Sequence, residues 1–146
     1  MFDDVAAGYD LTFTHTHIGR LQRKFVHDYL MKIMKKGHTG SVLELNAGTG
    51  EDALFFAKRG WEVLATDISP AMVAVGKEKA EKENLTGLIE FQVCDINRLN
   101  ELRLSQKFDL VFSNFGGLNC LDRKSLETLS VQAAAILKPG GRFIAV

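Results

Sequence analysis

Short apolar runs alternate with helical segments along most of this chain, and the alternation limits the folds open to it. The runs have the composition of buried strands, as in Leu110 to Phe112, and helix-capping residues such as Ser69 before Pro70 open the segments between them. Predicted strands cover residues 41–45, 61–66, 88–94, 108–113 and 142–146; predicted helices cover 51–58, 69–83, 98–104 and 122–137; a sharp turn covers 138–141. This order predicts an α/β fold, a Rossmann-like, doubly wound parallel sheet with helices on both faces.

One more helix is predicted before the sheet, over residues 18–36. Its apolar residues recur at steps of three and four and therefore share one face, which we expect to pack inward. They are Ile18, Leu21, Phe25, Tyr29 and Ile33. The opposite face carries Arg20, Arg23, Lys24, Lys32, Lys35 and Lys36. A basic stripe can contact a phosphate, but charged helix faces usually meet only water, and we expect a solvated face.

The length of the chain predicts a single domain, with residues 1–40 as an N-terminal lid and helix segment and residues 41–146 as the core. A chain of 146 residues, 46% of them hydrophobic, can bury one core without disulfides. Eighteen basic and eighteen acidic residues leave no net charge, so neither nucleic acid nor a membrane surface is an expected partner. Two cysteines make no disulfide framework and no apolar run is long enough to cross a membrane, so we expect a cytoplasmic protein.

The chain stops inside its last predicted strand, residues 142–146. We therefore expect a C-terminally truncated domain in which the later strands of the sheet are missing. The exposed edge of that fifth strand would offer unpaired backbone groups, which proteins normally cover. A homodimer formed through this edge is a possible arrangement.

A glycine-rich turn follows the first predicted strand. Gly48 and Gly50 allow the backbone to turn tightly and to approach a ligand closely, and Asn46 suits the same turn because Asn tolerates positive φ. Asp67 ends the second strand, 17 residues after Gly50, where its carboxylate can accept both hydroxyls of a ribose. Together these features predict a site for an adenosine-containing ligand at the carboxyl ends of the strands.

Acidic residues surround this turn and bear on which adenosine ligand it binds. Glu51 and Asp52 open the following helix, Glu44 lies on the preceding strand, and residues 46–56 contain no Lys or Arg. A pyrophosphate at that helix N-terminus would be repelled by each carboxylate, by roughly 1 kcal/mol at 4 Å in water. The acids favour a cationic ligand without phosphate, such as S-adenosyl-L-methionine. A nicotinamide dinucleotide matches the same spacing and is the alternative.

A further acid, Asp95, follows the third strand. Its carboxylate can accept from an adenine amino group, while Ile68 and Ile96 offer apolar surfaces to the ring. Alternatively, Asp95 caps the helical stretch that begins after it.

The order of these motifs resembles that of class I S-adenosylmethionine-dependent methyltransferases acting on small molecules. The matching segments, within residues 41–146, are Glu44–Gly50, Thr66–Ser69, Cys94–Ile96, Phe108–Asn114 and Leu137–Arg142, and the opening segment Phe2–Asp10 is similar to the lead-in of such enzymes. One departure is Asn46, which stands where the family has the first glycine of the turn. We expect cofactor binding to survive it.

The resemblance implies a set of cofactor-binding residues. The methionine moiety would be held by Glu44 and by the backbone of Asn46, Ala47, Gly48 and Gly50. The adenosine would be bound by Asp67, Ile68, Met72, Asp95 and Ile96. Asn114 and Phe115 would lie near the sulfonium, and Tyr9 would form part of a lid. No catalytic residue can be named, because alignment of the reacting atoms supplies much of the catalysis of a methyl transfer. The segment from Asn114 to Gly117 is not the Asn-Pro-Pro-Tyr pattern associated with methylation of amino nitrogens on bases or glutamine.

The sequence therefore predicts an enzyme that transfers a methyl group to an unidentified small molecule. No metal site is expected, because the four histidines and two cysteines show no paired ligand spacing. The alternatives are an NAD(P)-dependent oxidoreductase and a noncatalytic module that binds the adenosyl ligand and dimerises through its strand edge.

Overall fold

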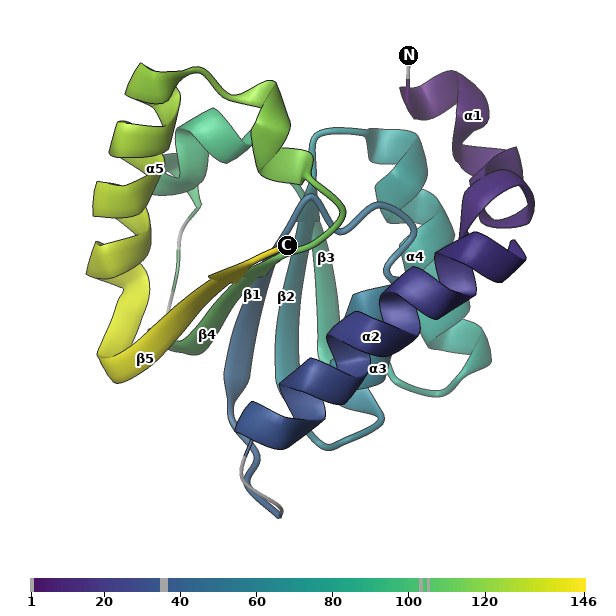
Figure 1. Ribbon diagram of the computed structural model, residues 1–146, viewed down its shortest axis with the longest axis horizontal. Coiled ribbons are helices and arrows are strands. Elements are labelled where there is room, and N and C mark those ends of the chain that lie inside the picture. The colour runs from purple at the N-terminus through teal and green to yellow at the C-terminus, as the bar shows by residue number, and fades with distance from the viewer. Residues whose placement is uncertain (1, 35–36, 103, 105) are drawn as a thin grey trace.

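The chain folds around a five-stranded parallel sheet in the order β3-β2-β1-β4-β5, as a computed structural model shows for residues 2–34, 37–102, 104 and 106–146 (Figure 1). The strands are β1 (Ser41–Leu45), β2 (Glu62–Asp67), β3 (Ile89–Val93), β4 (Phe108–Ser113) and β5 (Leu137–Ala145). All four neighbouring pairs are parallel. The strand order reverses direction beside β1, which places a ligand crevice where β1 and β4 end.

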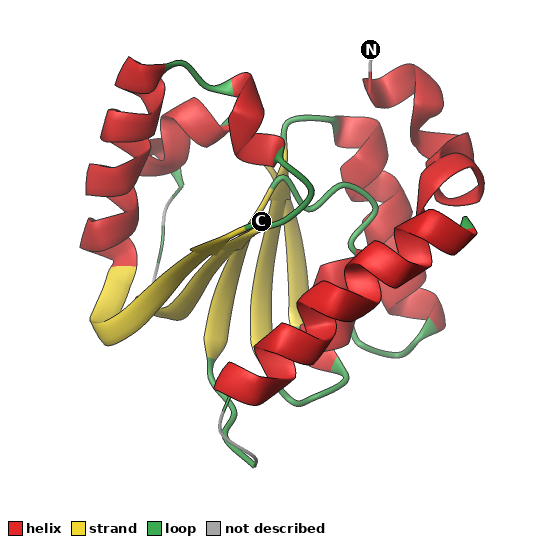
Figure 2. Cartoon of the chain, in the orientation of Figure 1, coloured by secondary structure: helices red, strands yellow, loops and turns green. Residues whose placement is uncertain are grey.

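Helices cover both faces of the sheet (Figure 2). They are α1 (Phe2–Tyr9), the π-helix η1 (Asp10–Thr14), α2 (His17–Ile33), α3 (Glu51–Ala57), α4 (Pro70–Lys82), the 3-10 helices η2 (Ile96–Glu101) and η3 (Gly117–Cys120), and α5 (Arg123–Ile136). Residues of α2, α3 and α4 share one core with the sheet, and those of η2 and α5 share the other. Within the described residues, none of these helices has both the length and the apolar character to span a bilayer.

The five predicted strands are found: β1 and β4 are correct to the residue, the bounds of β2 and β3 differ by one residue, and β5 begins five residues before its predicted start. The turn predicted at 138–141 is wrong, because these residues belong to β5. The β4–β5 ladder is irregular there: Phe108 pairs with Leu137, but Leu110 already pairs with Arg142. Gly140, with φ of 79°, lies in this bulged segment, so a turn-like glycine sequence is accommodated inside a strand.

The predicted orientation of the N-terminal helix is also wrong. Helix α2 turns most of its apolar stripe to solvent, with exposed fractions of 68% for Ile18 and 73% for Phe25, and Leu21 and Tyr29 are exposed as well. It buries Gly19 and Leu30 instead. The reason is a polar contact. Arg23, which was expected on the solvated face, and His27 both bind Asp52, a carboxylate buried on α3. The predicted last residues, Lys35 and Lys36, lie outside the described part.

The first residues of the chain pack against α4. Asp3 accepts hydrogen bonds from the Ser69 hydroxyl, at 2.5 Å, and from the Ala71 amide, at 3.1 Å. The Ser69 hydrogen bond lowers the pKa of Asp3 below its usual value. Further along, Asp10 accepts from the Thr49 hydroxyl at 2.7 Å. These contacts hold Tyr9 over the carboxyl ends of the strands.

Candidate functional site

A cavity of about 150 Å³ lies at the carboxyl ends of β1, β2 and β4. It is lined by Tyr9, Arg23, Asn46, Ala47, Gly48, Thr49, Glu51, Asp52, Asp67, Ile68, Met72, Asn114, Phe115, Gly117 and Cys120. The cavity occupies the crevice beside β1 where open α/β sheets bind their ligands.

Most of the predicted cofactor residues line this cavity: Tyr9, Asn46, Ala47, Gly48, Asp67, Ile68, Met72, Asn114 and Phe115. The remaining ones do not line it. Glu44 on β1 and Gly50 at the start of α3 are buried, Ile96 packs against the second core, and Asp95 caps η2 by accepting from the Asn97 amide at 2.9 Å. For Asp95 the capping alternative is the arrangement that the structure shows.

Asp67 holds the glycine-rich turn in place. Its carboxylate accepts from the Gly48 amide at 2.8 Å and from the Ser69 amide at 2.9 Å. Each of its oxygens retains a lone pair that a ribose hydroxyl could use. Asn46 has φ of 55°, so the expectation that this position needs a left-handed backbone is confirmed.

Glu44 lies behind the turn as a buried acid. It is 2% exposed, and its Oε2 atom has no hydrogen-bond partner within the described residues. Burial, followed by the charge of Asp52, raises the pKa of Glu44 well above its usual value of 4.5. Removing a carboxylate from water disfavours its charged form, and a neighbouring carboxylate adds to that effect.

Asp52 joins three elements at the floor of the cavity. Its carboxylate contacts Arg23 Nη1 at 3.1 Å and His27 Nε2 at 2.6 Å, both from α2, and it accepts from Asn114 Nδ2 at 2.9 Å. Its side chain is only 4% exposed. The Asp52 carboxylate on α3 therefore links α2 to the end of β4.

A second cation reaches the turn from α4. Lys79 Nζ lies 2.5 Å from a Glu51 oxygen and 2.7 Å from an Asp10 oxygen. The expectation that Glu51 and Asp52 leave the turn strongly acidic is therefore corrected, since Lys79 and Arg23 each bring a compensating charge. Neither cation is near the turn in sequence. Asp10, His15 and Glu51 are close enough to hold a metal ion together, but Lys79 already supplies positive charge to two of them.

An aromatic wall closes the side of the cavity next to β4. The ring centroids of Tyr9 and Phe13 are 5.6 Å apart, and those of Phe13 and Phe115 are 5.2 Å apart in an edge-to-face arrangement. Phe115 has φ of 55° and donates its amide to Asn114 Oδ1 at 2.8 Å. Burial raises the pKa of the Tyr9 hydroxyl, which keeps it protonated.

Four residues that line the cavity were not singled out from the sequence, and Glu51 and Asp52 were considered only as charges beside the turn. The four are Arg23, Thr49, Gly117 and Cys120. Except for Arg23, each lies within six residues of a predicted site residue, so proximity along the chain was the available signal. Arg23 gave no such signal, because only the packing of α2 brings it to the cavity.

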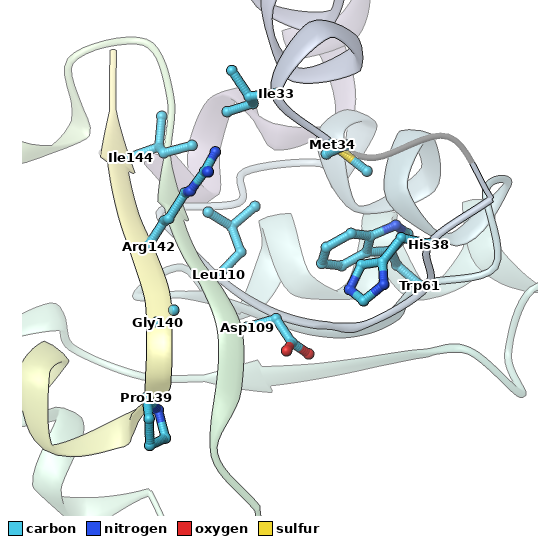
Figure 3. Close-up of a pocket in the computed structure, with 11 residues that line it drawn as sticks. Ile33, Met34, His38, Trp61, Asp109, Leu110, Pro139, Gly140, Arg142 and Ile144 are labelled. Atoms are coloured by element: carbon cyan, nitrogen blue, oxygen red, sulfur yellow. The ribbon is translucent and has the colours of Figure 1, made fainter.

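A second cavity, of about 290 Å³, lies at the opposite end of the sheet. Figure 3 shows Trp61 and His38 on one side of it and Ile144 on the other, with Leu110 between them. It shares no lining residue with the first cavity and lies beside the beginnings of β2, β4 and β5. None of its lining residues belongs to the glycine-rich turn, so the first cavity is the candidate site for the adenosyl ligand.

The residues of the first cavity suit S-adenosyl-L-methionine. Asn46 Oδ1 is buried without a partner among the described residues and can accept from the ammonium, and Asp67 can accept from the ribose. Ile68, 56% exposed, offers apolar surface to the adenine. A Cβ on Gly48 would meet nothing within 4 Å, so the turn leaves open space beside its backbone.

Comparison with known proteins shows a family match to the methyltransferase domain over residues 42–141. The ubiquinone/menaquinone biosynthesis C-methyltransferase UbiE of Acidiphilium cryptum is 35% identical over 144 residues, which cover 98% of this chain and 55% of that protein. The demethylmenaquinone methyltransferase of Thermus thermophilus is 33% identical over 150 residues, 99% of this chain and 62% of that one. The chain thus spans about half the length of the curated relatives it matches.

Solved structures show the same architecture. The PH0226 protein of Pyrococcus horikoshii superposes with a TM-score of 0.79 at 28% identity, over 94% of this chain and 64% of that one. The glycopeptide N-methyltransferase MtfA complexed with sinefungin gives a TM-score of 0.71 at 25% identity, over 85% of this chain and 49% of that one.

The parallel sheet, its switch point beside β1 and the cavity at the carboxyl ends define a Rossmann-like domain of the class I S-adenosylmethionine-dependent methyltransferase type. The chain belongs to the methyltransferase-domain family. The lining of its first cavity suits the cofactor of that class, S-adenosyl-L-methionine.

Proposed function

We propose that this chain takes part in methylating a ring carbon of a small quinol-type molecule. Two independent features support this acceptor. Relatives at 35% and 33% identity are C-methyltransferases named for ubiquinone and menaquinone biosynthesis. The wall that carries Tyr9 and Phe115 offers aromatic surface, against which a flat ring packs well.

One observation carries the proposal: the residue suited to the ribose and the aromatic wall face the same cavity. Asp67 lies at one part of its lining, and Phe115 and Asn114 at another. A cofactor held by its adenosine at Asp67 would leave its methyl-bearing end towards the loop after β4. An acceptor ring against Phe115 would then lie next to that methyl group.

The chemistry is a displacement at carbon. The bound cofactor supplies an electrophilic methyl group on a sulfonium. The acceptor carbon forms a bond to the methyl carbon, the methyl–sulfur bond breaks with its electron pair remaining on sulfur, and the ring carbon then loses its proton to solvent. The residues of the chain bind and align the two molecules, and such alignment can contribute about 7–11 kcal/mol to lowering the barrier.

Product analysis tests the proposal. The chain is incubated with S-adenosyl-L-methionine and a short-chain quinol that lacks one ring methyl, and the methylated ring is sought by mass spectrometry. Replacing Asp67 by Ala removes hydrogen bonds to a charged acceptor, about 1.5–3 kcal/mol, so cofactor affinity should fall about tenfold to a hundredfold. Asp28→Ala, at an exposed acid on α2, is the matched control.

Calorimetry with the cofactor and with NAD separates the ways in which the proposal can fail. Cofactor binding without ring methylation would show that the acceptor class is wrong or that the chain acts as a binding module. Binding of NAD in place of the cofactor would contradict methyl transfer altogether.

A further inference from the structure

Helix α2 exposes a continuous apolar stripe to solvent. Its members are spaced by three and four residues, so they share one face of the helix. They are Ile18, Leu21, Phe25 and Tyr29, with exposed fractions of 68%, 43%, 73% and 54%. The stripe is about 16 Å long, at 1.5 Å per residue. Single exposed apolar residues are normal, but a contiguous row of them marks a surface that binds something apolar.

The packing of α2 fixes the stripe on the outside of the molecule. Arg23 and His27 attach the opposite side of the helix to Asp52 of α3, and Leu30 is fully buried (Figure 1). Within the described part of the chain, no residue of the stripe belongs to either core. The stripe therefore takes no part in the folding of the described residues.

A basic hollow borders the stripe. Its charged lining residues are Arg20, Arg23, Lys24, Asp28, Glu51 and Arg59. Lys24 lies three residues after Leu21 on the same helix, so the hollow begins beside the stripe. Basic residues outnumber acidic ones in this lining.

Two arginines of the hollow are available for an anion. The two acids of the hollow are already paired with lysines. Arg20 and Arg59 contact no carboxylate among the residues that the structure describes. Arg59 is held in place, because its Cζ atom lies 3.7 Å from the centroid of the Phe55 ring and its Nη1 atom donates to the Phe55 carbonyl at 2.8 Å. A guanidinium group is well suited to phosphate.

We propose that the stripe and the hollow dock this chain on a membrane surface that contains anionic phospholipids. The stripe enters the boundary between the headgroups and the acyl chains, and Arg20 and Arg59 bind lipid phosphates. A bilayer of this kind supplies both the apolar phase and the negative charge that the surface lacks. A second copy of the chain fits less well, because it would bring the same two arginines to the contact.

Docking through α2 would place the first cavity close to the membrane. Arg23 of the same helix lines that cavity, which therefore lies within about one helix diameter, 10–12 Å, of the docked face. The zero net charge of the chain gave no reason to expect a membrane partner, but it conceals the local excess of positive charge beside the stripe. The docking surface goes beyond the proposed methyl transfer and does not depend on the acceptor.

Vesicle flotation tests the docking. The unmodified chain is mixed with vesicles of equal parts phosphatidylglycerol and phosphatidylcholine, or of phosphatidylcholine alone, and the bound fraction is measured after density-gradient centrifugation. Binding to the anionic vesicles should be at least about tenfold stronger and should weaken as salt is added. Inorganic phosphate should release the chain no more than sodium chloride of the same ionic strength.

Two pairs of variants separate the apolar and the charged contributions. Phe25→Gln should lower binding about tenfold, whereas Val131→Gln, at a residue of α5 that is 71% exposed, should leave it unchanged. Arg20→Gln combined with Arg59→Gln should lower binding to anionic vesicles about fivefold for each arginine. Its control combines Arg123→Gln with Lys124→Gln at the exposed start of α5. Circular dichroism checks that each variant is folded.

The proposal is overturned if the chain binds both kinds of vesicle equally or binds neither. Equal losses in Phe25→Gln and Val131→Gln also overturn it, because the stripe would then have no special part in binding. If sedimentation velocity without lipid shows a dimer that Phe25→Gln dissociates, the stripe contacts a second copy instead. Release by phosphate beyond that by chloride would make the hollow a site for free phosphate. The methyl acceptor is decided separately by product analysis.

Discussion

Glu44 is an ionisable residue whose side chain is buried away from water. It lies on β1, directly beneath the turn that shapes the cofactor site, and it is 2% exposed. Asp52 is the larger of the nearby charges that act on it, and Arg23 opposes that effect. Glu44 is therefore influenced by the Asp52–Arg23 ion pair, although Glu44 itself does not line the cavity.

The raised pKa of Glu44 predicts a pH-dependent stability. The folded chain keeps the Glu44 proton at pH values where the unfolded chain, with its pKa near 4.5, has lost it. The stabilisation from that proton is complete below pH 4.5 and decreases as the pH rises towards the raised pKa, by up to about 1.4 kcal/mol per pH unit. Glu44→Gln removes this dependence, so the free energy of unfolding of Glu44→Gln minus that of the unmodified chain should rise as the pH increases from 5 towards the raised pKa of Glu44.

Urea denaturation at pH 5, 6, 7 and 8 measures the difference. Glu62→Gln, at the exposed first residue of β2, controls for replacing an acid by an amide on a neighbouring strand. A Glu44→Gln difference that stays constant over this range would show that Glu44 is ionised in the folded chain.

The site residues differ in how far the sequence could predict them. Asn46, Asp67 and Asn114 were predictable because each lies at the end of a parallel strand, and such ends meet at one edge of a sheet. Arg23 and Lys79 were not, since they reach the turn from helices distant in sequence. The electrostatic argument from the acids alone was incomplete for that reason.

At the scale of elements, one aromatic ring sets how closely two helices approach β3. Phe91 of β3 is 4% exposed and lies against Gly50 at the start of α3 and Gly76 within α4. A Cβ on Gly76 would lie 2.8 Å from Phe91 Cζ, closer than non-bonded atoms tolerate. The glycine in the middle of α4 is therefore required by packing, although glycine is a poor helix former.

Gly76→Ala should destabilise the chain in spite of its better helix propensity. Overpacking of a core typically costs about 1–3 kcal/mol, which outweighs the gain of up to about 1 kcal/mol from replacing glycine in a helix. Urea denaturation measures the change. Gly8→Ala in α1, where a Cβ would meet nothing within 4 Å, is the matched control and should be neutral or stabilising.

Repeating Gly76→Ala in a Phe91→Leu variant tests whether the Phe91 ring causes the loss of stability. In that background the loss caused by Gly76→Ala should be smaller, because the smaller side chain leaves room for the new methyl group. If Gly76→Ala lowers the free energy of unfolding by the same amount in both backgrounds, a contact other than that with Phe91 is responsible.

The elements themselves were predicted unevenly. β1 and β4 are central strands, and their apolar residues mark them clearly, so their bounds were correct. The apolar face of α2 was placed wrongly because hydrophobic periodicity shows which residues share a face but not which face is buried. Here the contacts of Arg23 and His27 with Asp52 determine the orientation.

At the scale of the whole molecule, β5 forms one edge of the sheet. The amide of Val146 donates to the Ser113 carbonyl at 3.0 Å, and its carbonyl accepts from Gly116 at 2.8 Å, so both groups of Val146 point towards β4. Backbone groups alternate in direction along a strand, and those of Ala145 therefore point to the open side. An open edge of this kind is suited to pairing with another strand.

The homodimer that the sequence analysis allows through this edge can be tested directly. Ala145→Pro removes a donor that faces away from β4, so it should leave the fold intact and abolish edge pairing. Sedimentation velocity over a range of concentrations should show the unmodified chain passing from monomer to dimer and the Ala145→Pro chain remaining monomeric. Ala145→Val, which keeps the donor, should associate as the unmodified chain does. If the unmodified chain stays monomeric at every concentration, the β5 edge does not pair in solution, and the dimer expectation is wrong.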